Sequence, residues 1–261
     1  MKSRDALAKM YNYAYDGAPA NNNLTYMGTV PDSRKQIGFY LADSRAGKVP
    51  RGNGQTLYVL WVGINSIKTI WFEACQPQRN GGIGAQSTSD ALFIKATQRV
   101  QQQIAEVQYQ VDLLRTYSSI DKIPPRVLVI TMPDISSATM FQDSIQLWTK
   151  GDATKRKALT KLMQLLIAQY NAGLISAMKL SNTLVYDISG IWNAFLTTPA
   201  NFGLTYVTGR CLMNHIVCKD IDRYLFYFSR SCQDPCHLAL VVTCGDLQND
   251  IVVYRFSTPH N

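Results

Sequence analysis

The sequence predicts an α/β fold, a three-layer sandwich in which the strands of a parallel sheet alternate with helices. One observation is a set of short apolar runs rich in β-branched residues, at residues 57–62, 126–131 and 183–187. Such runs are typical of strands buried on both faces. The other is that the longer segments between them carry apolar residues at helical spacing. This alternation indicates βαβ units with helices on both faces of the sheet.

The first elements along the chain are short. A strand is expected at residues 11–15, where aromatic residues precede the turn sequence Asp-Gly-Ala-Pro. A short helix is expected at residues 33–42. Residues 47–55 contain Gly and Pro and indicate a loop, which leads into the apolar strand at 57–62.

Two long helices and one short helix are expected in the rest of the chain. The long helices span about residues 88–118 and 154–181, and the short helix at residues 189–196 stops before Pro199. A stripe of apolar residues at this spacing most often faces a core. The stripes contain Phe93, Val100, Ile104, Val107, Val111 and Leu114 in the first long helix, and Leu159, Leu162, Leu166, Tyr170, Leu174 and Met178 in the second.

Composition excludes some partners. The 261 residues are 46% hydrophobic, enough to bury a large core in one domain, and the net charge is +8. A nucleic-acid surface needs a continuous basic stripe with aromatic stacking partners, and no window has the ~18 apolar residues of a membrane span. We therefore expect neither a nucleic-acid nor a membrane partner. The densest basic cluster indicates a solvated helix face and contains Lys150, Lys155, Arg156, Lys157 and Lys161.

The six cysteines raise two possibilities. Cys211 and Cys218 bracket a short loop and predict a local disulfide, with two buried free thiols as the alternative. The other possibility is that the thiols bind zinc. A zinc site is usually formed by two pairs of ligands at standard spacing, and the sequence lacks a second such pair, so no metal or cofactor is expected. The candidate zinc ligands are His215, Cys232, Cys236 and His237.

Four segments, taken in order, resemble the GDSL-type or SGNH ester hydrolases. They are Asn-Tyr-Ala-Tyr-Asp-Gly-Ala at 12–18, the strand with Gly-Ile-Asn at 57–65, the stretch 185–211, and Cys-Lys-Asp-Ile-Asp-Arg-Tyr-Leu-Phe-Tyr at 218–227. The nearest resemblance is to the fungal secreted acetylesterase-like branch that acts on acetylated carbohydrates. This resemblance implies an acylated carbohydrate or other small ester as substrate, no cofactor, and secretion. The first residues carry no signal peptide.

The resemblance also implies roles for individual residues. In such hydrolases a Ser attacks the ester carbonyl, a His takes the Ser proton, and an Asp orients the His. Negative charge that develops on the carbonyl oxygen is met by preorganised donors. Gly17 matches a family glycine that donates its backbone N–H, and Asn65 matches a family asparagine that donates its side-chain amide. These two residues form the expected oxyanion hole.

Two departures from the family pattern bear on activity. Gly-Asp-Ser, which carries the nucleophile, does not occur in the sequence. Direct alignment puts Phe228 where the family has Asp and Ser231 where it has His. A later Asp-x-x-His, at Asp234 and His237, is either the same pair displaced by an insertion or a chance match, and the chance match is favoured. We therefore expect one SGNH-like domain over residues 1–261, N-terminally truncated and without appreciable esterase activity, whose tail at 228–261 is divergent.

The resemblance implies a flavodoxin-like sheet with strand order 2-1-3-4-5. The first strand carries the nucleophile and is missing here, so the strands at 11–15 and 57–62 each lose a neighbour. Two β-rich segments of the tail, 238–243 and 251–256, are candidate substitutes. We expect at least one to form a strand, placed at a sheet edge or in a hairpin.

An alternative function belongs to a different class. A non-catalytic homologue binds saccharides or protein partners through the remaining cleft. In that case Gly17, Asn65 and the aromatic residues Trp61 and Trp71 are binding residues. The sequence leaves the acyl group and the oligomeric state open.

Overall fold

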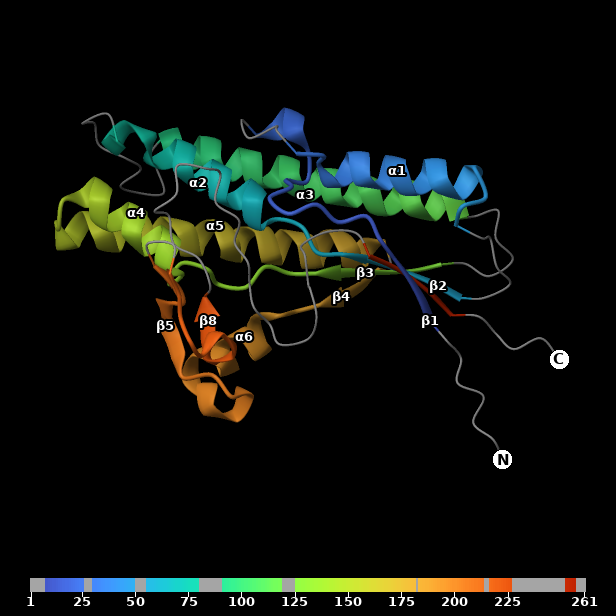
Figure 1. Cartoon of the computed structure of the whole chain (residues 1–261). Helices are drawn as coiled ribbons and strands as arrows, with labels where there is room; N and C mark the ends of the chain where they lie inside the picture. Colours follow the sequence, from blue (N-terminus) through green and yellow to red (C-terminus); the bar gives the residue numbers. More distant parts are fainter. Residues whose placement is uncertain are drawn as a thin grey trace.

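The chain has an α/β fold in which a five-stranded sheet carries a layer of long helices (Figure 1). The computed structural model describes residues 8–25, 30–49, 55–79, 91–118, 125–181, 183–213, 216–226 and 252–256. The strands of the main sheet are β1 (Ala8–Asn12), β2 (Gln55–Leu60), β3 (Arg126–Ile130), β4 (Leu184–Tyr186) and β9 (Val252–Phe256). The α-helices are α1 (Ser33–Arg45), α2 (Ile64–Arg79), α3 (Ala91–Ser118), α4 (Thr139–Thr149), α5 (Ala153–Leu180) and α6 (Ser189–Thr197).

The remaining elements are small. Two-residue strands β6 (Leu212–Met213) and β7 (Ile216–Val217) pair with each other, and β5 (Tyr206–Arg210) pairs with β8 (Tyr224–Phe226). The 3₁₀ turns are η1 (Asn22–Leu24), η2 (Pro199–Phe202) and η3 (Ile221–Arg223).

The expected helices are present, and two more were not predicted. Helices α1, α3, α5 and α6 lie close to the predicted ranges, whereas α2 and α4 come from segments to which the sequence assigned no element. The start of α2 does carry a helical signal, because Ile64, Ile67 and Trp71 recur at spacings of three and four with polar residues between them. The sequence interpretation missed this segment, which is buried on every side over residues 61–71.

The order of strands in the main sheet is β1-β9-β2-β3-β4. Strands β2, β3 and β4 are parallel, and β9 pairs antiparallel with both β1 and β2. The prediction that a tail strand would pair at an edge or form a hairpin is therefore wrong. The unpaired backbone groups of β1 and β2 are costly to bury, and any β-prone segment that reaches the slot satisfies them.

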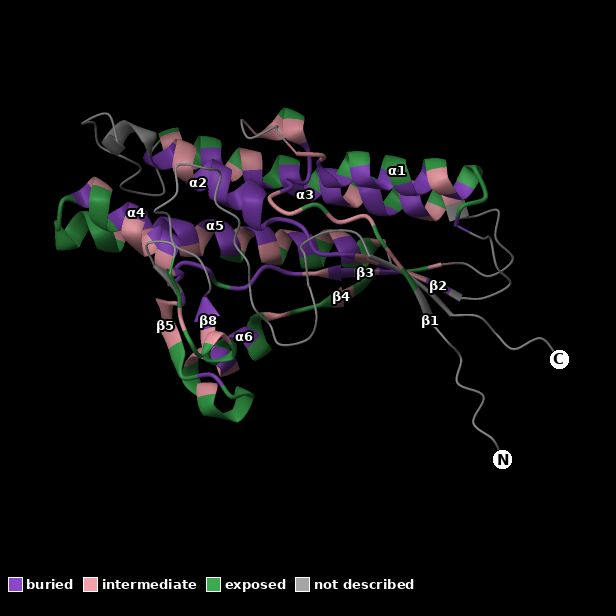
Figure 2. Cartoon of the chain, viewed as in Figure 1, coloured by how far each residue is buried: buried purple, intermediate pink, exposed green. Residues whose placement is uncertain are grey.

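The two faces of the sheet are covered unequally. Helices α1 to α5 lie on one side of the sheet in Figure 1, and burial alternates along β2 and β3 (Figure 2). Tyr58, Leu60, Val127 and Val129 are buried beneath the helices, while Leu57, Val59, Leu128 and Ile130 on the other face are only half-buried and Leu184 and Tyr186 are exposed. In the described part of the chain the arrangement thus has two layers. The expectation of strands buried on both faces in a three-layer sandwich is wrong there.

The disulfide predicted between Cys211 and Cys218 is present, with their Cα atoms 4.9 Å apart. It closes the β6–β7 hairpin beside the β5–β8 pair. Cys75 is a buried free thiol in α2, and Cys232, Cys236 and Cys244 lie outside the described residues. Among the helices that the structure describes, none combines the length and the apolar character that a membrane crossing requires.

Candidate site at the carboxyl end of the sheet

The carboxyl ends of the parallel strands bring four segments together. The loop after β1 contacts the start of α2, which follows β2, through a hydrogen bond from Asn65 to Ala18. The indole of Trp61, just after β2, donates to the Thr131 carbonyl at the end of β3, 3.1 Å away. The Thr131 hydroxyl in turn donates to Asp187, just after β4, over 3.0 Å. Parallel sheets bind ligands at this edge.

Gly63 is fixed by packing as well as by backbone conformation. Its φ is +140°, and a Cβ at this position would lie 2.7 Å from the ring of Tyr170. The Tyr170 hydroxyl donates to the Val62 carbonyl over 2.7 Å, which holds the ring against the glycine. A side chain at position 63 would need the space that the Tyr170 ring from α5 occupies, so glycine suits this position just before α2.

Asn65 contacts the residue that follows Gly17. The Asn65 Nδ2 donates to the Ala18 carbonyl over 3.2 Å, and the side chain is only 7% exposed. Gly17 adopts a left-handed φ of +79° in the preceding turn. An amide Nδ2 carries two protons. One of them is used on the Ala18 carbonyl.

The loop after β1 is held by side chains from three helices. The Ala20 N–H donates to Ser66 Oγ of α2 over 3.1 Å. The Ala20 carbonyl accepts from Ser33 Oγ of α1 at 3.2 Å and from Gln110 Nε2 of α3 at 2.8 Å. Both backbone polar groups of one buried loop residue are therefore satisfied, and the loop has a defined path past Asn65.

The buried carboxylate of Glu106 also anchors the loop after β1. Glu106 of α3 is 6% exposed and accepts hydrogen bonds from Asn21 at 3.0 Å, Gln110 at 2.8 Å and Arg34 Nε at 2.8 Å. Arg34 Nη2 also pairs with Glu106, and the hydrogen bond to Glu106 raises the pKa of the Arg34 guanidinium. We call these four residues the Glu106 clamp. It ties the loop to α1 and α3.

Asp187 organises the other side of the edge. Its Oδ1 accepts from the Ser189 N–H at 3.0 Å and from Thr131 Oγ1 at 3.0 Å. Hydrogen bonds from Ser189 first, and then from Thr131, hold the pKa of this carboxyl below its ordinary value. The Ile188 N–H donates to Thr131 Oγ1 over 3.1 Å. The charged aspartate thus fixes the start of α6 against β3.

The two tryptophans proposed as binding residues belong to the core. Trp61 and Trp71 are 5% and 0% exposed. Trp71 donates to the Leu159 carbonyl over 3.0 Å and stacks on Trp148, with ring centroids 5.4 Å apart. Both indole N–H groups are satisfied by backbone carbonyls, so neither ring forms a surface for a ligand.

Asp234 and His237, the displaced catalytic pair, lie outside the described residues. Of the other two predicted site residues, Asn65 donates to the Ala18 carbonyl, next in sequence to Gly17. In the described ranges, His, Cys, Asp and Glu side chains nowhere gather in a group of three or more that could hold a metal ion.

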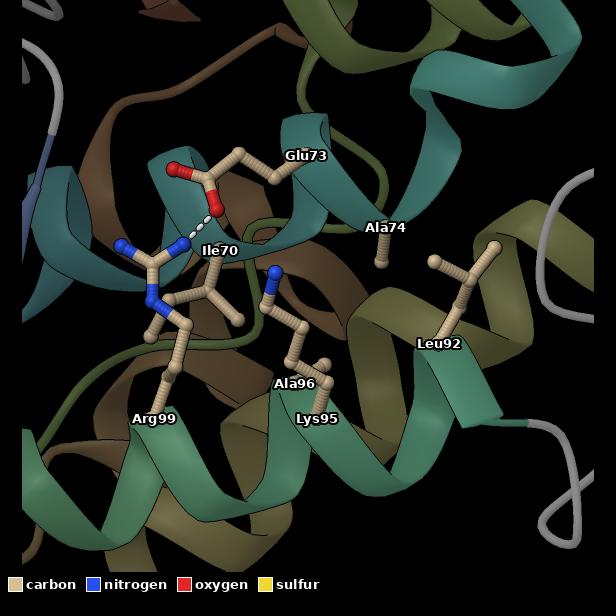
Figure 3. Close-up of a pocket in the computed structure, with 7 residues that line it drawn as sticks. All are labelled: Ile70, Glu73, Ala74, Leu92, Lys95, Ala96 and Arg99. Carbon is tan, nitrogen blue, oxygen red and sulfur yellow. Dashed lines mark ion pairs between the residues drawn. The ribbon is translucent and has the colours of Figure 1, made fainter.

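A small cavity between α2 and α3 lies apart from this edge (Figure 3). Its volume is about 50 Å³, room for only one or two waters. Glu73 and Arg99 form an ion pair across it, and Arg99 also donates to the Leu24 carbonyl. These charged groups are engaged with each other and with the backbone. The cavity is a packing gap between helices.

Sequence reasoning missed Glu106 and Asp187. Asp187 is the last residue of the expected strand at 183–187, so its place at the sheet edge was visible as a signal. Glu106 lies with Gln103 and Gln110 on a polar stripe of α3, at spacings of three and four. The same pattern occurs on solvated helix faces, and burial alone distinguishes the two.

In comparisons with known proteins, the chain matches no family model and no curated protein. The functional assignment therefore rests on the geometry of the sheet edge and on the motifs in the sequence.

Proposed function

We propose that the chain is an SGNH-type ester hydrolase homologue, of the acetylesterase kind that acts on acetylated carbohydrates, without a nucleophile of its own. The observation that carries the proposal is the contact between Asn65 and the Gly17–Ala18 turn at the carboxyl edge. Two neutral donors side by side suit an ester carbonyl oxygen, which gains negative charge during acyl transfer.

The sheet supports the same proposal. Strands β1, β2, β3 and β4 run in one direction, with a single slot between β1 and β2. The family resemblance implies a nucleophile-bearing strand in that slot. Here the slot holds β9, antiparallel to both neighbours, and Gly-Asp-Ser does not occur among the 261 residues.

The chemistry left to such a site is limited. Donors alone polarise a bound carbonyl for attack by water, and removing the nucleophile of a triad leaves only the residual rate from donors and binding. The occupied slot therefore also favours a second candidate, a non-catalytic homologue that binds acylated saccharides through Gly17 and Asn65.

Binding of an acetylated oligosaccharide and of its deacetylated counterpart tests the site. We expect the acetylated form to bind more tightly, and Asn65→Asp to remove the difference because the amide donor is lost. Asn193→Asp on the exposed face of α6 is the matched control and should retain the preference. Equal affinity of the parent chain for both ligands would contradict the proposal.

Turnover of a chromogenic acetate ester separates the two candidates. We expect the parent chain to release acetate no faster than Asn65→Ala. Release at an ordinary enzymatic rate that His237→Ala abolishes would show instead a working hydrolase.

A further inference from the structure

A wide groove runs along the outer side of α4 and α5, near the basic cluster found in the sequence. Its volume is about 760 Å³. One wall is Gln142 of α4, and the other is one face of the amino-terminal half of α5. The lining residues from α5 are Ala153, Thr154, Arg156, Lys157, Ala158, Thr160, Lys161 and Gln164.

The groove carries positive charge that the described residues do not neutralise. Arg156, Lys157 and Lys161 are exposed, and no acidic side chain is among the lining residues. In the described part of the chain neither lysine forms an ion pair, and Arg156 only meets the neutral Gln146 at 3.3 Å. A ligand with anionic groups would therefore face three available cations.

The nearby acidic residues are already engaged. Asp152 caps α5 by accepting from the Thr154 N–H at 2.9 Å and the Lys155 N–H at 3.1 Å. Asp143, next to the groove residue Gln142, pairs with Arg210 of β5. Asp152 also pairs with Lys155 at 3.9 Å, so each of these two carboxylates has a basic partner outside the lining of the groove.

The uncharged residues that line the groove favour one class of ligand. Gln142, Thr154, Thr160 and Gln164 offer hydroxyl and amide groups that suit a hydroxyl-rich ligand. No aromatic side chain is among the lining residues. Single-stranded nucleic acids are held by base stacking on aromatic rings, so this lining favours a sugar polymer over a nucleic acid.

We propose that this groove binds an anionic polysaccharide, with Arg156, Lys157 and Lys161 meeting its carboxylates. The groove is joined to the loop after β3, because Gln164 Nε2 donates to Ser136 Oγ over 3.3 Å and Gln142 Nε2 donates to the Ser136 carbonyl over 2.6 Å. A chain of sugars in the groove therefore lies beside the loop that leads to the carboxyl edge. Binding here does not depend on ester chemistry at Asn65.

The test is binding of a fluorescent oligo-uronate to the full chain at several salt concentrations. We expect the affinity to fall as the salt concentration rises, because basic side chains that bind a polyanion release the counterions associated with it. Lys157→Glu with Lys161→Glu should weaken binding by at least about tenfold. The matched control, Lys35→Glu with Lys219→Glu, makes the same change in net charge at exposed positions elsewhere and should stay within about twofold of the parent.

Three outcomes would overturn the proposal. The first is that the oligo-uronate does not bind at low salt. The second is that the groove variant and the control lose the same amount of affinity. The third is that neutral dextran binds as tightly as the oligo-uronate. A single-stranded oligonucleotide that binds more tightly than the uronate, and is lost in the groove variant, would assign the groove to nucleic acid instead. Failure of the acetyl-ester experiments leaves all of these measurements unchanged.

Discussion

At the residue scale, Gly63 and Glu106 show how individual groups set the path of the chain at the sheet edge. Gly63 allows α2 to start directly after the strand while Tyr170 packs against the backbone. Glu106 places a carboxylate under the loop that carries Gly17, where three different side chains donate to it. Glu106 accepts hydrogen bonds from residues far away in the sequence, and Gly63 leaves room for the ring of a distant tyrosine.

Gly63→Ala should lower the free energy of unfolding by about 2–5 kcal/mol, because the new Cβ overlaps the Tyr170 ring and the backbone is in a region that disfavours side chains. Urea denaturation measures the change. Gly38→Ala in α1 is the control, since a Cβ there meets nothing and alanine favours the helix. Equal stability of the Gly63 variant and the parent would show that the ring moves freely.

Glu106→Gln keeps the size of the side chain and turns one acceptor into a donor facing other donors. We expect a loss of about 2–4 kcal/mol in the free energy of unfolding. Glu73→Gln removes the charge of a carboxylate that is 30% exposed in its pair with Arg99, and should cost less than about 1 kcal/mol. Similar losses in the two variants would mean that the clamp contributes no more than a surface ion pair.

At the element scale, Asp187 joins three elements at once. It follows β4, accepts from Thr131 at the end of β3, and accepts from Ser189 at the start of α6. The helix therefore begins where the carboxylate fixes its first turn. The hydrogen bonds from Ser189 and Thr131 favour the charged form of this group.

Asp187 should make stability depend on pH in the acid range. Folding lowers the pKa of this carboxyl, so its contribution is present above its unfolded pKa of about 3.9 and is lost as the pH falls toward its lower folded pKa. Asp187→Asn should be less stable than the parent at pH 6, and the difference should shrink below about pH 4. A difference in thermal stability that does not change with pH would contradict this.

At the scale of the whole molecule, β9 completes the sheet. It pairs with β1 on one side and β2 on the other, with Val253 opposite both Tyr11 and Tyr58. Residues from the two ends of the chain and from its middle thereby form one continuous set of hydrogen bonds. A strand in this interior position cannot lose its N–H groups without leaving a neighbour unpaired.

Val253→Pro should therefore cost at least about 2 kcal/mol and remove protection from hydrogen exchange in both β1 and β2. Val253→Ala keeps the backbone N–H and is the control, with protection expected in both strands. Protection that persists in β1 and β2 of the proline variant would show that the two strands do not depend on β9.

The fold class and part of the site could be predicted because they depend on local patterns. Apolar residues at helical spacing located α3 and α5, and the short separation of Cys211 and Cys218 located the disulfide. The family resemblance paired Gly17 with Asn65, and the loop after β1 does contact the start of α2 through Asn65 and Ala18. Helix α2 was missed although Ile64, Ile67 and Trp71 also recur at helical spacing.

Pairing and burial were decided only by the tertiary structure. Nothing in the residues 252–256 specifies that they lie between β1 and β2, since any β-prone segment can satisfy unpaired backbone groups. Apolar residues in β2 and β4 look alike in sequence, yet Leu60 is buried while Leu184 is 53% exposed, because the helical layer covers one face. The sequence by itself located four of the six described α-helices, the parallel strands and the polar residues at the ends of those strands. Their neighbours depend on contacts between distant segments, which local spacing does not encode.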